Sequence, residues 1–210
     1  MQYGDEFKTY TYEHFNLGAL GELPDGRRFR FCLNGATASI AGQPYQSALA
    51  TADHRNLSVI AASVGQGHGG VTLGATAVTA DQYKNGFLAV RATAAAGGGR
   101  LYALGAHPAY DASVAAAFYF RDGVTVQEAW TAGTTLVDLI ASPYSSIIAL
   151  APSSGFGYSY VVGYAVADVP AANYGWFQTL GLACVDQIFT DGQILSPAAG
   201  QNSVVFLTLE

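Results

Sequence analysis

The sequence predicts an all-β protein, an antiparallel β-sandwich or barrel with little helix, and three observations lead to this fold class. Residues 156–167 alternate large and small side chains with a period of 2, which is the side-chain period of a strand. Asp-Gly and Asn-Gly pairs recur along the chain, and such pairs tolerate the positive φ that tight hairpin turns require. Glycine supplies 25 of 210 residues, which disfavours long helices.

The alternating stretch predicts the strand around which the sheet is built. Phe156, Tyr160 and Tyr164 fall on one face, and small residues such as Gly157 and Gly163 fall on the other. A face of small residues lets another backbone approach closely, either inside a sandwich or at a subunit contact. Pro170 interrupts the run, and the next strand is predicted to begin at Tyr174.

The remaining strands are predicted from apolar or alternating runs that are bounded by turn residues. Two hairpins are expected, one joining residues 87–93 to 100–106 and one joining residues 115–120 to 124–129. Further strands are expected at residues 28–33, 57–64, 71–75, 146–150, 178–189 in part, and 203–209. Residues 129–140 are expected to hold one short helix that is capped by Thr134 or Thr135.

The chain is expected to form one β-rich domain over residues 17–210, because neither a Pro-rich linker nor a change of composition divides it. Residues 1–16 are aromatic and weakly acidic. This N-terminal segment is interpreted either as an arm that reaches onto a neighbouring molecule or as a first edge strand of the domain. Both alternatives stay open at this point.

Composition narrows the class of partner. Only 11% of residues are charged, against about 25% in an ordinary soluble domain, which favours an oligomer or a component of an assembly over a compact monomer. The net charge of −6 and the presence of only two lysines, Lys8 and Lys84, disfavour nucleic-acid binding. The N-terminus lacks the pattern of a signal peptide, and no apolar run approaches the roughly 18 residues that span a bilayer. We therefore expect a soluble protein made in the cytosol.

No catalytic, cofactor-binding or metal-binding residue is assigned, and an enzyme is not expected. Gly65–Gly70 matches the spelling of a dinucleotide-binding fingerprint, but a predicted strand follows it, so it is interpreted as a glycine loop. The histidines lie at no metal-ligand spacing, and His54 and His107 are interpreted as ordinary loop residues. Cys32 and Cys184 are expected to be buried free thiols, with a disulfide between them left open.

Several stretches, in a shared order, resemble the small capsid decoration (cement) proteins of tailed bacteriophages and their virion relatives. The resemblance covers residues 25–181. Its stretches are Asp25–Phe31, Ala41–Tyr45, Thr79–Leu88, Arg100–Leu104, Thr134–Tyr144, Val162–Val166 and Tyr174–Gly181.

The resemblance implies a structural protein on the outer face of the virion capsid that clamps neighbouring major capsid proteins together. Its expected partners are copies of itself, as a trimer, and the major capsid protein, with no nucleic acid, membrane or cofactor. Another virion component, such as a tail or head-fibre module, and a carbohydrate-binding module that uses the thirteen tyrosines are the alternatives. The candidate partner-binding residues are Phe7, Tyr10, Tyr12 and Phe15 in the N-terminal segment, and Arg28 and Arg30 on one strand face.

Overall fold

The computed structural model describes residues 1–91, 98–150, 160–185, 188–190, 193–195 and 203–208. Over these residues the chain consists of strands, turns and two short 3-10 turns, η1 (Asp5–Phe7) and η2 (Ala52–His54), without an α-helix. All pairings between named strands are antiparallel. The predicted all-β antiparallel fold class is therefore confirmed.

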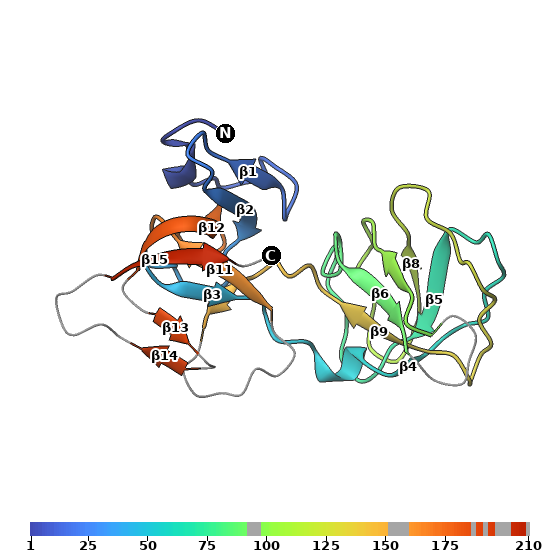
Figure 1. Ribbon diagram of the computed structural model, residues 1–210. Helices are drawn as coiled ribbons and strands as arrows, with labels where there is room; N and C mark the ends of the chain where they lie inside the picture. The colour runs from blue at the N-terminus through green and yellow to red at the C-terminus, as the bar shows by residue number, and fades with distance from the viewer. Residues whose placement is uncertain (92–97, 151–159, 186–187, 191–192, 196–202, 209–210) are drawn as a thin grey trace. The chain divides into compact units, whose positions relative to one another are not determined.

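The chain divides into two compact units (Figure 1). Unit 1 comprises Met1–Leu49 and Pro143–Glu210, and unit 2 comprises Ala50–Ser142. The expectation from the sequence was one β-rich domain over residues 17–210, with residues 1–16 apart from it. The contacts instead place residues 1–16 inside unit 1 and make residues 50–142 a unit of their own. Unit 2 is thus an insertion that interrupts unit 1.

Unit 1 is built on a seven-stranded sheet in which β12 (Tyr174–Val185) is the central strand. The first half of β12 pairs with β2 and β11, and its second half pairs with β15. The other strands of the unit are β1 (Leu20–Glu22), β2 (Arg28–Leu33), β3 (Pro44–Gln46), β10 (Ile148–Ala149), β11 (Val161–Ala165) and β15 (Ser203–Thr208), with a separate hairpin of β13 (Ile188–Thr190) and β14 (Gln193–Leu195).

The expected close approach of backbones beside the alternating stretch is present. The described part of that stretch, residues 160–167, contains β11, and residues 156–159 lie outside the described residues. A Cβ atom on Gly163 would lie 2.5 Å from the carbonyl oxygen of Gln178, so only glycine lets β11 lie this close to β12. The buried side chains of Cys32, Tyr45, Val162 and Phe177 pack together in the core of this unit.

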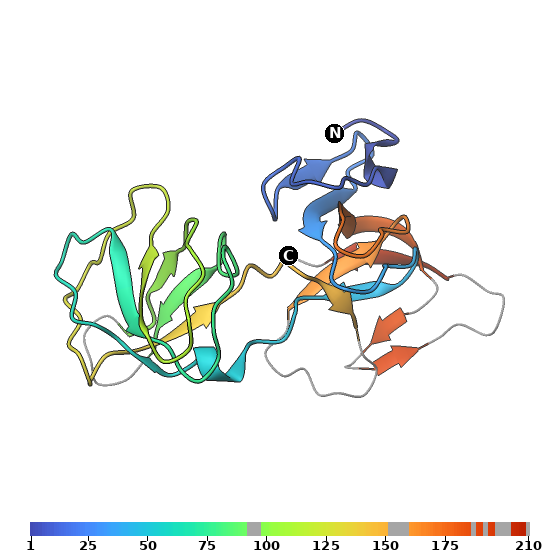
Figure 2. The ribbon, with the colours of Figure 1, turned by 180° about the vertical axis from the view of Figure 1, so that it is seen from behind.

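Unit 2 is a closed antiparallel barrel. One sheet has the order β4-β9-β6-β7, and β5 pairs with β8. The bridge between Leu104 and Phe120 links the ends of β7 and β8, and the bridge between Val59 and Val71 links the end of β4 to β5, so the six strands follow one another around a ring. Figure 2 shows these strands from behind. They are β4 (Leu57–Ser58), β5 (His68–Thr72), β6 (Phe87–Val90), β7 (Leu101–Ala103), β8 (Ala115–Tyr119) and β9 (Leu136–Ile140).

Two local predictions within unit 2 are wrong, and one hairpin is confirmed. The hairpin of β6 and β7 forms as expected. The strand at residues 115–119 exists, but it pairs with β5 and not with residues 124–129, because the chain departs after the Asp122-Gly123 turn. The helix expected at residues 129–140 is absent. Val137 and Leu139 point into the core as alternate residues of β9, which is the strand period.

The glycine-rich motif at residues 65–70 serves the packing of the barrel. Its second half is the start of β5, not a loop, and the buried Gly69 faces the indole ring of Trp130. A Cβ atom on Gly69 would lie 2.6 Å from that ring and 3.1 Å from Leu88. The motif therefore provides room for Trp130 in the barrel core.

A chain of polar contacts links two histidines through Tyr83 in unit 2. His54 and His107 are 0% and 5% exposed, so both are buried, unlike ordinary loop residues. His54 Nε2 donates a hydrogen bond to the Thr76 carbonyl at 3.0 Å. Its Nδ1 is therefore free of a proton and accepts a hydrogen bond from the Tyr83 hydroxyl. The Tyr83 backbone N–H donates to His107 Nε2 at 3.0 Å, and His107 Nδ1 donates to the Pro108 carbonyl at 2.9 Å. Backbone partners thus fix the tautomer of each imidazole.

Replacing Gly69 by alanine is expected to destabilise unit 2, because the new methyl group must displace Trp130 or Leu88. Overpacking of this kind costs about 1–3 kcal/mol. Gly67→Ala is the matched control, since a Cβ at that position meets nothing within 4 Å. Urea unfolding measures both variants, and equal unfolding free energies for the two would contradict the packing role of Gly69.

The free energy of unfolding is expected to fall as the pH rises from 10.0 toward about 12, in part because of Tyr83. Burial raises the pKa of Tyr83 from 10.0 to about 12, so the unfolded chain ionises this phenol first. The stabilising contribution is complete below pH 10 and is lost as the pH rises toward about 12. Urea unfolding across this range should show a weaker loss in Tyr83→Phe than in the wild type. The exposed Tyr119→Phe is the control, and an unchanged slope in Tyr83→Phe would refute the assignment.

Candidate partner-binding surface

The N-terminal segment is held on unit 1 by backbone and aromatic contacts. Tyr10 and Tyr174 exchange two backbone hydrogen bonds, of 2.9 and 2.8 Å, at the start of β12. Phe15 packs against the buried Phe31 and Trp176, with ring centroids 5.3 and 5.2 Å apart. Tyr10 also contacts Phe31, at 5.7 Å. Two of the four predicted aromatic residues, Tyr10 and Phe15, thus attach the segment to its own unit.

The other two predicted aromatic residues point into solvent. Phe7 is 56% exposed and Tyr12 is 61% exposed, as is Tyr3. Phe15 keeps 40% of its surface accessible in spite of its contacts. Exposed large apolar side chains that gather in one region are typical of interaction surfaces. The first fifteen residues therefore present several aromatic side chains from a segment whose position is fixed.

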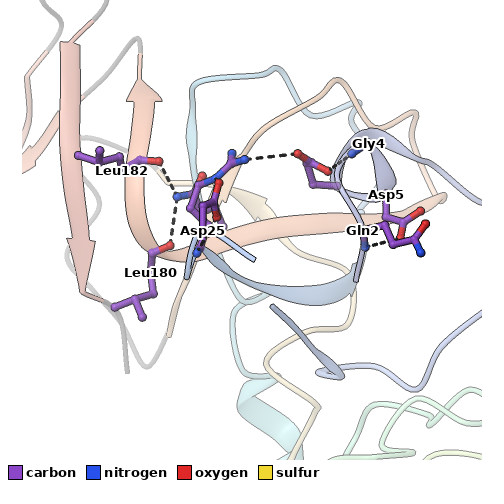
Figure 3. A network of polar contacts seen from close by, with 9 residues as sticks. Gln2, Gly4, Asp5, Asp25, Leu180 and Leu182 are labelled. Carbon is purple, nitrogen blue, oxygen red and sulfur yellow. Dashed lines mark hydrogen bonds and ion pairs between the residues drawn. The ribbon is translucent and has the colours of Figure 1, made fainter. Parts of the chain in front are cut away.

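A polar network fixes the turn that carries Phe7. Glu6 is buried, and its carboxylate accepts the Gly4 N–H at 2.6 Å and faces the Arg27 guanidinium at 3.5 Å. Arg27 Nε also donates to Asp25 Oδ2 at 2.8 Å, so one guanidinium lies between two carboxylates. Figure 3 shows these contacts, together with Leu180 and Leu182 on β12, whose carbonyls accept from the Gln178 amide.

Electrostatic contacts on the two turns also lower the pKa of exposed carboxyl groups. The hydrogen bond from Lys8, at 2.6 Å, is the main reason that the pKa of Asp5 is lowered. The backbone N–H of Arg27 is the main reason that the pKa of Asp25 is lowered. The side chains of Asp5 and Asp25 are 32% and 36% exposed, so solvent screens these contacts and they contribute little to stability.

Arg28 and Arg30 lie two residues apart on β2 and are both half-buried. Arg28 pairs with Glu22 at 3.3 Å, and both side chains are substantially exposed. Arg30 donates to the Gly18 carbonyl at 2.9 Å, and its guanidinium lies 5.9 Å from the centre of the Tyr144 ring. Each arginine therefore has a partner within the chain. The structure does not bring them together with Phe7 and Tyr12 through any described contact.

Two hollows beside the N-terminal turn were not predicted. One, of about 570 Å³, is lined by Asp25, Gly26, Arg27, Leu180, Gly181 and Leu182. The second, of about 390 Å³, is lined by residues that include Phe7, Arg27, Val166, Gln178 and Leu182. Both hollows share Arg27 and Leu182, and Leu182 is 62% exposed. The strand period of β12 is consistent with an outward side chain at Leu182. The sequence does not indicate that the turn at residues 25–27 lies beside it.

Among the described residues, no three histidine, cysteine, aspartate or glutamate side chains gather as a metal site. Cys32 and Cys184 are both free, and Cys184 is exposed, contrary to expectation, because it alternates with the buried Ala183 and Val185 on β12. Burial raises the pKa of the Cys32 thiol well above its usual value. In the part of the chain that the structure describes, no helix meets the length and hydropathy of a membrane span.

Comparison with known proteins adds no family to these observations. No family model, no curated protein and no solved structure matches the chain.

Proposed function

We propose that the chain is a structural virion protein that decorates the outer surface of a phage capsid and stabilises it by clamping neighbouring major capsid proteins. The observation that carries this proposal is the set of exposed aromatic side chains, Tyr3, Phe7, Tyr12 and Phe15, on a segment fixed to β12. The resemblance of residues 25–181 to capsid decoration proteins supports the same role.

The physical basis of clamping is selective binding. A protein that binds the assembled shell and not its dissociated subunits stabilises the shell by the free energy of that binding. Aromatic side chains dominate such interfaces, because they bury a large area at a small cost in side-chain entropy. The low proportion of charged residues, 11%, suits a surface that is covered by partners, including further copies of the chain in an oligomer proposed as a trimer.

The direct test is to mix the purified protein with capsids assembled without it. A decoration protein saturates the whole shell, at a constant ratio to the major capsid protein, and raises the temperature at which the shell dissociates. Binding at a single vertex instead indicates a tail or head-fibre component. Absence of binding to any part of the particle contradicts a role on the virion surface.

A carbohydrate-binding module is the second candidate, because the rings of Tyr3 and Tyr12 are each 61% exposed and aromatic faces stack on sugars. A glycan array separates the two functions. Hits that disappear in Tyr12→Ser, together with no binding to shells, would favour the module.

Shell binding is expected to weaken when the outward aromatic residues are removed. Phe7→Ser and Tyr12→Ser each remove an exposed anchor, and loss of an interface anchor costs more than about 1 kcal/mol, which is roughly fivefold in affinity. Unfolding free energy should change by less than about 0.5 kcal/mol, because both side chains are exposed.

The control for this experiment is Tyr119→Ser in unit 2, since Tyr119 is 55% exposed and lies outside the N-terminal segment. Binding isotherms on undecorated capsids measure all three variants. If Phe7→Ser and Tyr12→Ser bind as tightly as Tyr119→Ser, the N-terminal segment is not the contact surface.

A further inference from the structure

We propose that the two hollows beside Arg27 form one docking groove for an extended protein segment that presents an apolar side chain next to lysine or arginine. This inference deepens the proposed function and rests on it, since it names the chemistry of the segment that the shell would present.

Beside the polar Arg27 and Gln178, the groove has apolar residues that come from three parts of unit 1. Phe7 comes from η1, Ala41 and Gly42 from the loop before β3, and Leu182 from β12. Phe7 and Leu182 are 56% and 62% exposed, so large apolar side chains line a hollow that is open to solvent. A hollow of about 390 Å³ has the size of sites that hold small ligands, which is enough for a side chain of a partner.

The charge around the groove decides which kind of segment fits. Arg27 is the cationic side chain among the described lining residues, and it already contacts two carboxylates, Glu6 and Asp25. A third carboxylate, that of Asp168, accepts the backbone N–H of the lining residue Ala41 at 2.8 Å. Carboxylates therefore outnumber the guanidinium by three to one in the contacts at this site. A cationic segment is attracted to such a site, whereas an acidic segment is repelled.

The geometry of the groove is fixed before any partner arrives. Glu6 and the Gly4 N–H fix the turn on one side. On the other side, the buried Gln178 amide donates to the carbonyls of Leu180 and Leu182, at 3.1 and 2.9 Å. Walls held in this way lose little conformational entropy on binding, which favours affinity.

The test uses the full chain and a short acetylated, amidated peptide that alternates lysine and leucine. A second peptide, with glutamate in place of lysine, is the charge-reversed control. Backbone amide shifts in the NMR spectrum of the labelled protein report the site. We expect the lysine peptide to shift the amides of Ala41, Val166 and Leu182 to saturation, with an affinity that falls as salt is added. The glutamate peptide should leave them unchanged.

Two substitutions in the groove and one matched control complete the test. Asp25→Asn keeps an acceptor for the Arg27 N–H but removes a charge, and Leu182→Ser removes an apolar wall. Each substitution is expected to lower the affinity for the lysine peptide by about threefold to tenfold. Asp122→Asn is the control, because Asp122 also lies in an Asp-Gly turn and pairs with a neighbouring arginine, Arg121, at 2.8 Å, but in unit 2.

Three outcomes would overturn the groove: no binding of the lysine peptide, equal binding of both peptides, or binding that Asp25→Asn and Leu182→Ser leave intact. Failure here is distinguishable from failure of the proposed function. If shell binding depends on Phe7 and Tyr12 but the lysine peptide does not bind, the groove proposal is wrong and the proposed function stands. If the lysine peptide binds in the groove but the protein does not bind capsids, the role on the virion is contradicted and the groove proposal stands.

Discussion

The register shift in β12 is the constraint on which unit 1 depends. The strand changes register against β2 between Gln178 and Leu180, and beyond this point it also pairs with β15. Such a bulge bends a strand and frees backbone carbonyls from regular pairing. The side chain of Gln178, which is 1% exposed, donates to the carbonyls of Leu180 and Leu182 and so satisfies both. Gly163 lets β11 lie close to the Gln178 carbonyl at the same point of β12, so one glutamine and one glycine together accommodate the irregularity.

The same bend gives the unit its candidate binding surface. After the bulge, Leu180, Gly181 and Leu182 face the turn that contains Asp25 and Arg27, and the space between them is one of the two hollows. Arg27 then contacts Glu6, which positions the N-terminal turn and the exposed Phe7 beside the second hollow. The backbone bonds of Tyr10 to Tyr174 and the ring contacts of Phe15 position the rest of the segment. A segment bound at several points presents its outward aromatic residues in a defined arrangement, which lowers the entropic cost of any contact that they make.

Much of the fold was predictable from local patterns, because period-2 alternation and turn chemistry are local properties. The strand at residues 28–33 has the predicted bounds, and the hairpin of β6 and β7 forms as expected. The partner of β8 was not predictable, because a strand pairs according to long-range packing and not to the nearest turn. In residues 129–140, a helical spacing and a strand spacing both fit the apolar residues, and only the barrel core selects the second.

The candidate site also contains residues that were predictable from the sequence and residues that were not. The outward Phe7 and Tyr12 were predicted from an aromatic segment with no evident strand partner, whereas Glu6, Arg27 and Leu182 were not. Their importance comes from neighbours that are distant in the sequence, since Glu6 meets Arg27 and Leu182 lies beside the turn at Asp25 only in the folded chain. The boundaries of unit 2 were not predictable for a related reason, because contacts between residues distant in the sequence define the unit and the composition does not change at its ends.

The place where unit 2 enters the chain explains how unit 1 tolerates so large an insertion. β3 and β10 are antiparallel neighbours, with Gln46 opposite Ile148, so unit 2 occupies the position of a hairpin loop between two paired strands. Long insertions at such loops cost little, because the entropy of closing a loop grows only with the logarithm of its length. The cost falls further when the inserted chain folds with its ends together, and the pairing of β4 with β9 brings the two ends of unit 2 together.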